Sequence, residues 1–163
     1  GAAIPGVNLN PNTTEVYGAL GYKWLTLKYS HVVSAGFIGW GGGAGINQNT
    51  RGSNYLELNG SYDLGNGWGV TGHVGSQKVK NYANATYATA DYTDWNLGVT
   101  KDVGFGVVGL TYSAANTKGT CNAAGGTNPY CWADSNFVAG TGPTTGFKDV
   151  SKGVAVLTFK KTF

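Results

Sequence analysis

The chain has 163 residues, of which only 12% are charged, and its formal net charge is +3. A charge this weak and dispersed argues against a nucleic-acid-binding protein, and a soluble domain would carry about 25% charged residues. No run of about 18 apolar residues is present, which excludes a transmembrane helix. The closed β-barrel is the other structure that satisfies every backbone group in lipid. We therefore predict an all-β chain that folds as an antiparallel transmembrane β-barrel, with residues 1–163 forming one domain.

The first strands in chain order form a predicted hairpin over residues 15–20 and 23–33, which turns at Gly21-Tyr22. Its second strand alternates, with Leu25 and Leu27 on one face and Trp24 and Lys28 on the other. Such a period of two indicates a strand with one apolar and one polar face.

The clearest alternation covers residues 55–64, which turn at 65–67 and return as residues 68–77. The Asn66-Gly67 pair supplies the positive φ angles that a tight hairpin requires. A third hairpin joins residues 92–101 to residues 105–114, and a last strand covers residues 154–163. The chain thus contains about seven or eight strands.

The connections between these strands alternate in length. Short turns follow every other strand, whereas the links 34–52, 79–90 and 115–149 are long and rich in Gly, Asn, Thr and Ala. Short turns at one end and long external loops at the other are typical of a bacterial outer-membrane barrel, and aromatic residues gather near both strand ends as its interfacial belts require. An ordinary β-sandwich is the alternative, but it does not explain the alternating loop lengths.

The two cysteines, Cys121 and Cys131, lie in the longest of these loops. Their close spacing predicts a disulfide that braces the loop in an oxidising compartment. A metal-binding thiol pair is the alternative, but no histidine or third cysteine lies nearby in the sequence. We expect no metal and no cofactor.

The last strand carries apolar residues at every second position. We predict that Leu157, Phe159 and Phe163 on one face act as an assembly signal for the barrel-insertion machinery, which Lys161 on the same face weakens. The strand count is odd, whereas single-chain bacterial barrels have an even number of strands. Either residues 2–10 form an irregular eighth strand despite Pro5, or N-terminal strands are missing, and we favour the second interpretation.

A set of polar residues recurs on the face opposite the leucines, and we predict that these residues line a pore. Their mixed charges and amides suit a water-filled passage with a weak ion preference, although a hydrogen-bonded plug in a closed barrel is the alternative. His31 and His73 lack a third partner at a spacing suited to catalysis or metal binding, so we predict no catalytic residue and no enzyme. The predicted pore-lining residues are Lys28, Glu57, Asn59, Asp63, Thr71, His73, Gln77, Asp94, Asn96 and Thr100.

Four blocks of sequence resemble the TorF family of porin-like proteins of the proteobacterial outer membrane. They are Ser53-Asn-Tyr-Leu-Glu-Leu-Asn-Gly-Ser-Tyr-Asp-Leu-Gly-Asn-Gly-Trp68, residues 73–80, Asp91-Tyr-Thr-Asp-Trp-Asn-Leu-Gly-Val-Thr-Lys-Asp102, and the closing Lys160-Lys-Thr-Phe163. The resemblance covers about residues 12–118 and the last strand, and the chain departs from it in the Gly-rich loop 36–45 and the cysteine-containing insertion 115–149. Members of that family are longer, which implies that this chain is the C-terminal portion of a barrel of roughly twelve strands.

The resemblance implies an outer-membrane channel for passive diffusion of small polar solutes or ions. A non-conducting structural or surface-interaction barrel that acts through its long loops is the alternative. The expected surroundings are outer-membrane lipid and lipopolysaccharide, with no nucleic acid. A homo-oligomer is possible as well as a monomer, because an apolar barrel face has the same sequence pattern whether it meets lipid or a neighbouring subunit.

Overall fold

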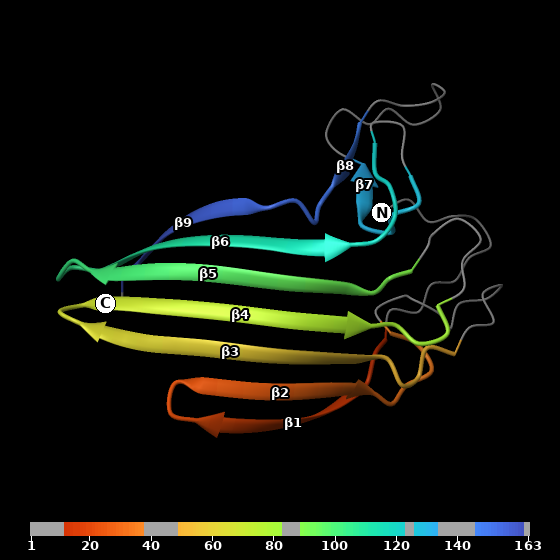
Figure 1. Cartoon of the computed structure of the whole chain (residues 1–163), viewed down its shortest axis with the longest axis horizontal. Coiled ribbons are helices and arrows are strands. Elements are labelled where there is room, and N and C mark those ends of the chain that lie inside the picture. The colour runs from red at the N-terminus through yellow and green to blue at the C-terminus, as the bar shows by residue number, and fades with distance from the viewer. Residues whose placement is uncertain (1–11, 38–48, 83–88, 123–125, 134–145, 162–163) are drawn as a thin grey trace.

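The computed structural model describes residues 12–37, 49–82, 89–122, 126–133 and 146–161. Seven long strands form one antiparallel sheet in the order β1-β2-β3-β4-β5-β6-β9, and β7 pairs with β8 in a small second sheet (Figure 1). The strands are β1 (Glu15–Tyr22), β2 (Leu25–Val32), β3 (Asn54–Gly65), β4 (Trp68–Lys78), β5 (Tyr92–Asp102), β6 (Val107–Thr117), β7 (Cys131–Ala133), β8 (Phe147–Asp149) and β9 (Val154–Lys160). The predicted all-β antiparallel class is confirmed.

No helix of these described ranges has the length and hydropathy needed to cross a membrane.

The register of the strands sorts the side chains into two unlike faces. Leu58 of β3 pairs with Leu27 of β2 and with Val74 of β4, so apolar residues lie opposite one another from strand to strand. One position along, Asn59 pairs with His73, which pairs with Asn96. A sheet with a side-chain period of two keeps this division along its whole length.

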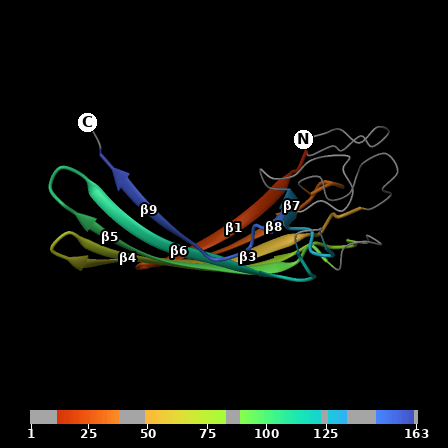
Figure 2. The same cartoon turned by 90° about the horizontal axis from the view of Figure 1, so that it is seen from above.

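The sheet is strongly curved, and β7 and β8 lie inside the curve (Figure 2). The polar side chains point into this concave side, where they converge and are half-buried. The apolar side chains point outward and remain exposed, as shown by Leu97 at 59%, Leu110 at 51% and Leu157 at 75%. Within the described residues the buried hydrophobic cluster is small and lies at the long-loop end, and its members are Val32, Phe37, Val79 and Ala90.

The prediction for the first turn is wrong. Gly21 and Tyr22 continue β1 and pair with Thr26 and Leu25, and the chain turns at Lys23-Trp24, where Lys23 has a φ of 52°. This turn places Tyr22 and Leu25 opposite each other. Trp24 then lies on the apolar side, with its ring centroid 5.9 Å from that of Tyr62 in an edge-on contact.

Two further details differ from the sequence-based prediction. The strand expected from residue 105 begins at Val107, and the short strands β7 and β8 lie inside the segment expected to be a loop. Residues 2–10, Phe163, the Gly-rich loop 36–45 beyond residue 37 and parts of the three long loops lie outside the described residues.

The sheet is open in the part of the chain that the structure describes. Each of its edge strands, β1 and β9, has a single partner, so no closed barrel is formed by these residues. The described residues also place no second sheet against the apolar face, because β7 and β8 lie on the concave side. The apolar face therefore has no cover within the described chain.

Candidate functional site

A hydrogen-bonded network centred on His73 occupies the middle of the concave face. His73 Nε2 lies 2.9 Å from Asp94 Oδ2 and 2.9 Å from the hydroxyl of Tyr55. The Tyr55 hydroxyl donates to the other carboxylate oxygen of Asp94 at 2.8 Å. Three strands, β3, β4 and β5, thus contribute one side chain each to a closed triangle of polar contacts.

The opposite side of the imidazole leads to β2. His73 Nδ1 lies 2.8 Å from Asn59 Oδ1, and Asn59 donates through its amide nitrogen to Glu57 Oε2 at 3.0 Å. Lys28 forms an ion pair with Glu57, with 3.1 Å between Nζ and Oε1. The network therefore spans four adjacent strands and contains two carboxylates, one ammonium group and one imidazole.

Gly75 makes this network geometrically feasible. It lies between Glu57 and Asp94 in the cross-strand row, and the Tyr55 side chain crosses over it. A Cβ at this position would overlap the Tyr55 hydroxyl and come within 2.8 Å of Asp94 Oδ1. The glycine leaves the space that the Tyr55 hydroxyl needs to reach both His73 and Asp94.

Both nitrogens of His73 face oxygen atoms. Asn59 presents its carbonyl oxygen to Nδ1, since its amide nitrogen donates to Glu57, and Asp94 presents a carboxylate oxygen to Nε2. The imidazole is therefore held between two oxygen partners, one on β3 and one on β5.

The network presents polar side chains to the concave side of the sheet. No group of three or more metal-ligating side chains is found among the described residues. Glu57, His73 and Asp94 retain 15%, 13% and 24% side-chain exposure, so solutes on the concave side can reach them. Such a surface is suited to transient contacts with ions and hydroxylated or charged solutes.

All ten predicted pore-lining residues lie on this one face of the sheet. Directly paired residues of neighbouring strands point to the same side, and side chains alternate between the two sides along each strand. Five join the network directly, namely Lys28, Glu57, Asn59, His73 and Asp94. Of the other five, Asn96 pairs with His73, and Asp63, Thr71, Gln77 and Thr100 lie farther along the same face. Asp63 accepts a hydrogen bond from the backbone of Gly65 near the short turn, and Gln77 lies at the long-loop end.

Threonines fill the space above several glycines of this face. A Cβ at Gly98 would lie 2.7 Å from Thr71 Oγ1 and 2.8 Å from Thr111 Oγ1, and one at Gly69 would lie 2.8 Å from Thr100 Oγ1. These glycines receive hydroxyl-bearing side chains from neighbouring strands, so this part of the wall is lined by threonines.

At the long-loop end, the segment 126–133, which we call the Tyr130 arm, lies on the concave face. Tyr130 donates from its hydroxyl to the carbonyl of Ala90 at 2.6 Å and accepts from Gln77 Nε2 at 3.1 Å. Its ring meets that of Tyr92 edge-on, with 5.4 Å between centroids. Burial raises the pKa of the Tyr130 phenol, and Tyr92 adds to the shift.

The predicted disulfide is confirmed. Cys121 and Cys131 are bonded with 2.04 Å between their sulfur atoms, and Cys131 follows Tyr130 directly. The described cysteines are both used in this bond. The bridge therefore ties the Tyr130 arm to Cys121, in the segment that follows β6.

The proposed assembly residues Leu157 and Phe159 lie on the apolar face of β9, where they are 75% and 56% exposed. Phe163 lies outside the described residues. Exposed aromatic residues also gather at the short-turn end of this face, as predicted, and include Tyr22, Trp24, Tyr62, Trp68 and Phe105. Tyr55 and Tyr92, near the long-loop end, belong to the concave polar face, where both are in one cross-strand row with Gln77.

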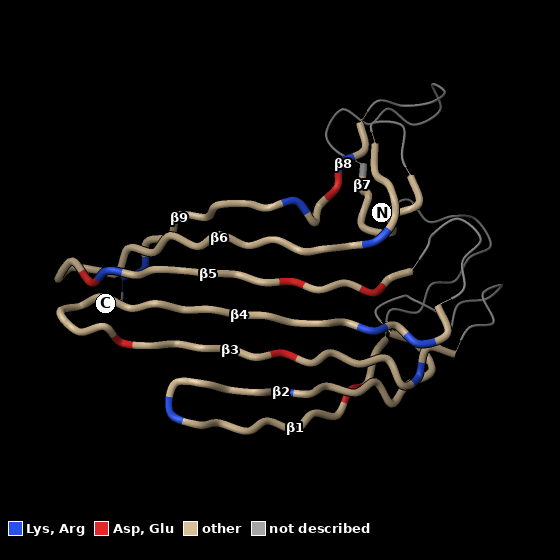
Figure 3. Tube along the Cα trace, viewed as in Figure 1, with Lys and Arg blue, Asp and Glu red and all other residues tan. Residues whose placement is uncertain are grey.

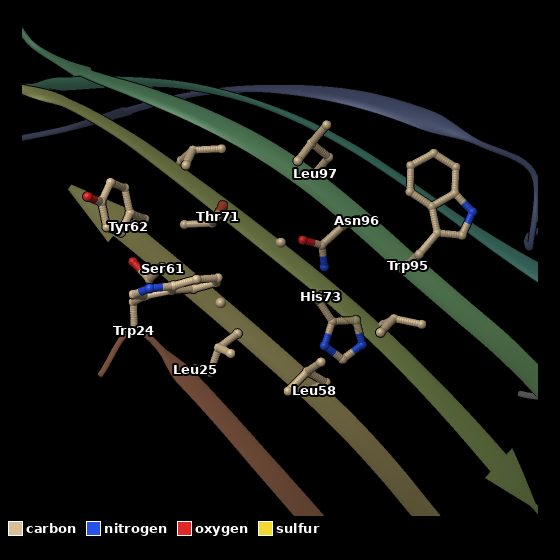
Figure 4. A pocket seen from close by; sticks show the side chains of 14 residues that line it. Trp24, Leu25, Leu58, Ser61, Tyr62, Thr71, His73, Trp95, Asn96 and Leu97 are labelled. Carbon is tan, nitrogen blue, oxygen red and sulfur yellow. The ribbon is translucent and has the colours of Figure 1, made fainter. Parts of the chain in front are cut away.

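The apolar face contains a shallow hollow of about 440 Å³. Gly60 and Gly72 pair across β3 and β4 at its floor, and the absence of two side chains creates the depression. Trp24, Leu25, Leu58, Tyr62, Trp95 and Leu97 surround it (Figure 4). The hollow breaks an otherwise continuous apolar surface.

Three residues of the site, Tyr55, Gly75 and Tyr130, were not predicted from the sequence. Tyr55 is two residues before Glu57 and four before Asn59, so the alternation of side chains along the strand alone could have assigned it to the polar face. The role of Gly75 depends on a side chain from another strand, and the position of Tyr130 depends on a contact with a residue 53 positions away. No local pattern in the sequence signals either of these.

A family model described as "Bacterial protein of unknown function (Gcw_chp)" matches residues 2–163 of the chain. No curated protein and no solved structure matches it.

Proposed function

We propose that this chain, which belongs to the bacterial protein family Gcw_chp, forms the wall of an outer-membrane β-barrel through which small polar solutes or ions diffuse. The apolar face of the sheet would meet lipid and the concave polar face would line a water-filled passage. Closure of the barrel would require a further partner for the edges of β1 and β9. Outer-membrane lipid, lipopolysaccharide and the barrel-insertion machinery are the partners that this proposal requires.

The observation that carries the proposal is the reversed distribution of side chains over a seven-stranded sheet. Large apolar residues are exposed over the convex face, including Leu20 at 75% and Leu97 at 59%, while charged residues are half-buried on the other face. Exposed apolar patches on soluble monomers rarely exceed a few hundred Å². In a transmembrane barrel, apolar residues face lipid and polar residues face the lumen, which is the distribution seen here.

The position of the charged residues supports the same interpretation. They cluster at the strand ends and loops, and few lie along the strands (Figure 3). A barrel carries an apolar outer band about 25 Å tall between its two interfaces, and charge is costly within that band. The charges that lie well within the strands belong to the concave network, where Lys28, Glu57 and Asp94 are paired.

The wall would favour cations modestly. Of the residues predicted to line the pore, Glu57, Asp63 and Asp94 are acidic, whereas Lys28 is basic. Rings of carboxylates favour cations in channels, and the ion pair of Glu57 with Lys28 weakens the effect here. A channel role is also what the predicted resemblance of residues 53–68 and 91–102 to TorF porins implies.

The test is the conductance of the purified protein in a planar lipid bilayer, with insertion verified independently. Discrete current steps that scale with salt concentration would support the channel. A silent bilayer that contains inserted protein would overturn it.

A second function is favoured by one specific observation. The network of Lys28, Glu57, Asn59, His73, Tyr55 and Asp94 satisfies its members internally, and the Tyr130 arm lies against the same face. A wall whose polar side chains bind one another and are partly covered by the Tyr130 arm would suit a non-conducting structural barrel that binds partners through its long loops. The silent bilayer described above is the result that would favour this alternative.

A further inference from the structure

The Tyr130 arm covers part of the concave wall. Beneath the arm, Gln77 is 6% exposed and Ala90 is fully buried. The two residues and the Tyr130 hydroxyl form a triangle of hydrogen bonds, since Gln77 Nε2 also donates to the carbonyl of Ala90 at 3.1 Å. The ring of Tyr130 thus lies over the wall rather than away from it.

The arm is fastened at several independent points. Asn128, which is 1% exposed, donates to Thr117 Oγ1 at 2.8 Å and accepts from the backbone nitrogen of Tyr130 at 2.9 Å. Val150 donates its backbone N–H to the carbonyl of Tyr130 at 3.1 Å. The disulfide between Cys121 and Cys131 adds a covalent tie directly after Tyr130.

We propose that Tyr130 is the constriction residue that limits the size of solutes entering the passage from its long-loop end, and that the disulfide holds it in this position. The inference rests on the proposed function, because it assumes that the concave face lines an aqueous passage. Tyr130 stands on the concave side, so its ring occupies cross-section that solutes would otherwise use. The edge-on contact with Tyr92 and the disulfide directly after Tyr130 hold the ring over this wall, and the hydrogen bonds to Gln77 and Ala90 add to its fixation.

The size limit can be measured with neutral polyethylene glycols of graded mass, which reduce the single-channel current only when they enter the pore. We expect the Tyr130→Ala variant to admit larger polymers than the wild type. Tyr130→Phe keeps the ring and should keep the wild-type limit. Trp132→Ala is the matched control, because Trp132 is an aromatic residue of the same arm that is 59% exposed.

The role of the disulfide is tested on the wild-type protein. An excess of a dithiol reductant such as dithiothreitol gives up two electrons and two protons, converts the Cys121–Cys131 disulfide into two thiols and is itself oxidised to a cyclic disulfide. We expect reduction to raise the polymer size limit of the wild type and to leave that of Tyr130→Ala unchanged.

The outcomes separate this inference from the proposed function. If the wild type conducts and Tyr130→Ala keeps its polymer limit, Tyr130 is not the constriction. If the wild type conducts and reduction does not change its polymer size limit, the disulfide does not hold Tyr130 in place. If the wild type and Tyr130→Ala both insert but remain silent, the proposed channel itself is overturned.

Discussion

The hydroxyl of Tyr55 lies in the space above Gly75 that a side chain would fill, and from there it donates to Asp94. The two residues belong to adjacent strands and are not directly paired, since Gly75 pairs with Glu57 and Tyr55 with Gln77. A diagonal contact of this kind requires a long side chain on one strand and none on the other. It couples the backbone of β4 to the charge network that spans β2 to β5.

Replacing this glycine should therefore disturb the network. We expect Gly75→Ala to lower the free energy of unfolding by about 1–3 kcal/mol, the usual cost of overpacking a filled site. The measurement is the denaturant midpoint of the folded protein. Gly72→Ala is the control, because the nearest atom to its added Cβ is a backbone oxygen 4.0 Å away. Equal midpoints for the two variants would contradict the proposed contact.

The Tyr55 hydroxyl should by itself contribute to the stability of the folded protein. Tyr55→Phe leaves the ring but removes the hydrogen bond to Asp94, and bonds to charged groups are worth about 1.5–3 kcal/mol. Partial exposure of Asp94 should place the loss at the lower end of this range. Tyr62→Phe alters a tyrosine that is 49% exposed on the apolar face and should change stability little. A Tyr55→Phe variant as stable as the wild type would show that water replaces the hydroxyl without cost.

How far the sequence predicts this arrangement depends on the range of the interactions involved. The hairpin of β3 and β4 was predictable because both strands alternate strictly and Asn66-Gly67 determines the turn. The first turn was not, since Gly21-Tyr22 resembles a turn locally while pairing with Leu25 and Thr26 extends the strands past it. A contact such as Tyr55 with Asp94 requires the registers of two successive strand pairs, and one of these follows a long loop.

The charge of the wall should determine ion preference. Removing a carboxylate with Asp94→Asn should lower the ratio of cation to anion permeability, measured as the reversal potential under a salt gradient. The effect should be larger at 0.1 M than at 1 M salt, because the Debye length falls from about 10 Å to about 3 Å. Lys101→Gln removes a charge outside the concave network, next to Trp68, and should leave the reversal potential unchanged. An equal change in both variants would contradict the assignment of Asp94 to the wall.

The convex face should not accept charge if it meets lipid. We expect Leu110→Arg to reduce insertion into vesicles, because arginine on the lipid face costs about 2–4 kcal/mol at the bilayer midplane and less near the interfaces. The adjacent Thr111→Arg places the same side chain on the concave face and should insert more efficiently. Insertion can be followed by the shift in gel mobility between heated and unheated samples. Efficient insertion of Leu110→Arg would indicate that water or protein covers this face.

The Tyr130 hydroxyl should keep its proton at alkaline pH. Free tyrosine ionises near pH 10, and burial raises the pKa of Tyr130 in the folded protein. Its contribution to stability is therefore complete below about pH 10 and is lost only as the pH rises through the higher folded value. A difference titration of tyrosinate absorbance between the wild type and Tyr130→Phe reports this group. Ionisation of Tyr130 near pH 10 in the folded protein would contradict its burial.

Two adjacent residues of β5 distinguish directly whether the concave face meets water and the convex face meets lipid. Asn96 lies on the concave face beside His73, and Leu97 lies on the convex face, where it is 59% exposed. The native cysteines are tied in a disulfide, so single cysteines placed at 96 and 97 can be treated with a charged, membrane-impermeant thiol reagent after insertion into vesicles. We expect the Asn96→Cys variant to react and the Leu97→Cys variant not to react. Rapid reaction of Leu97→Cys, the more exposed position in the isolated sheet, would contradict contact of the convex face with lipid.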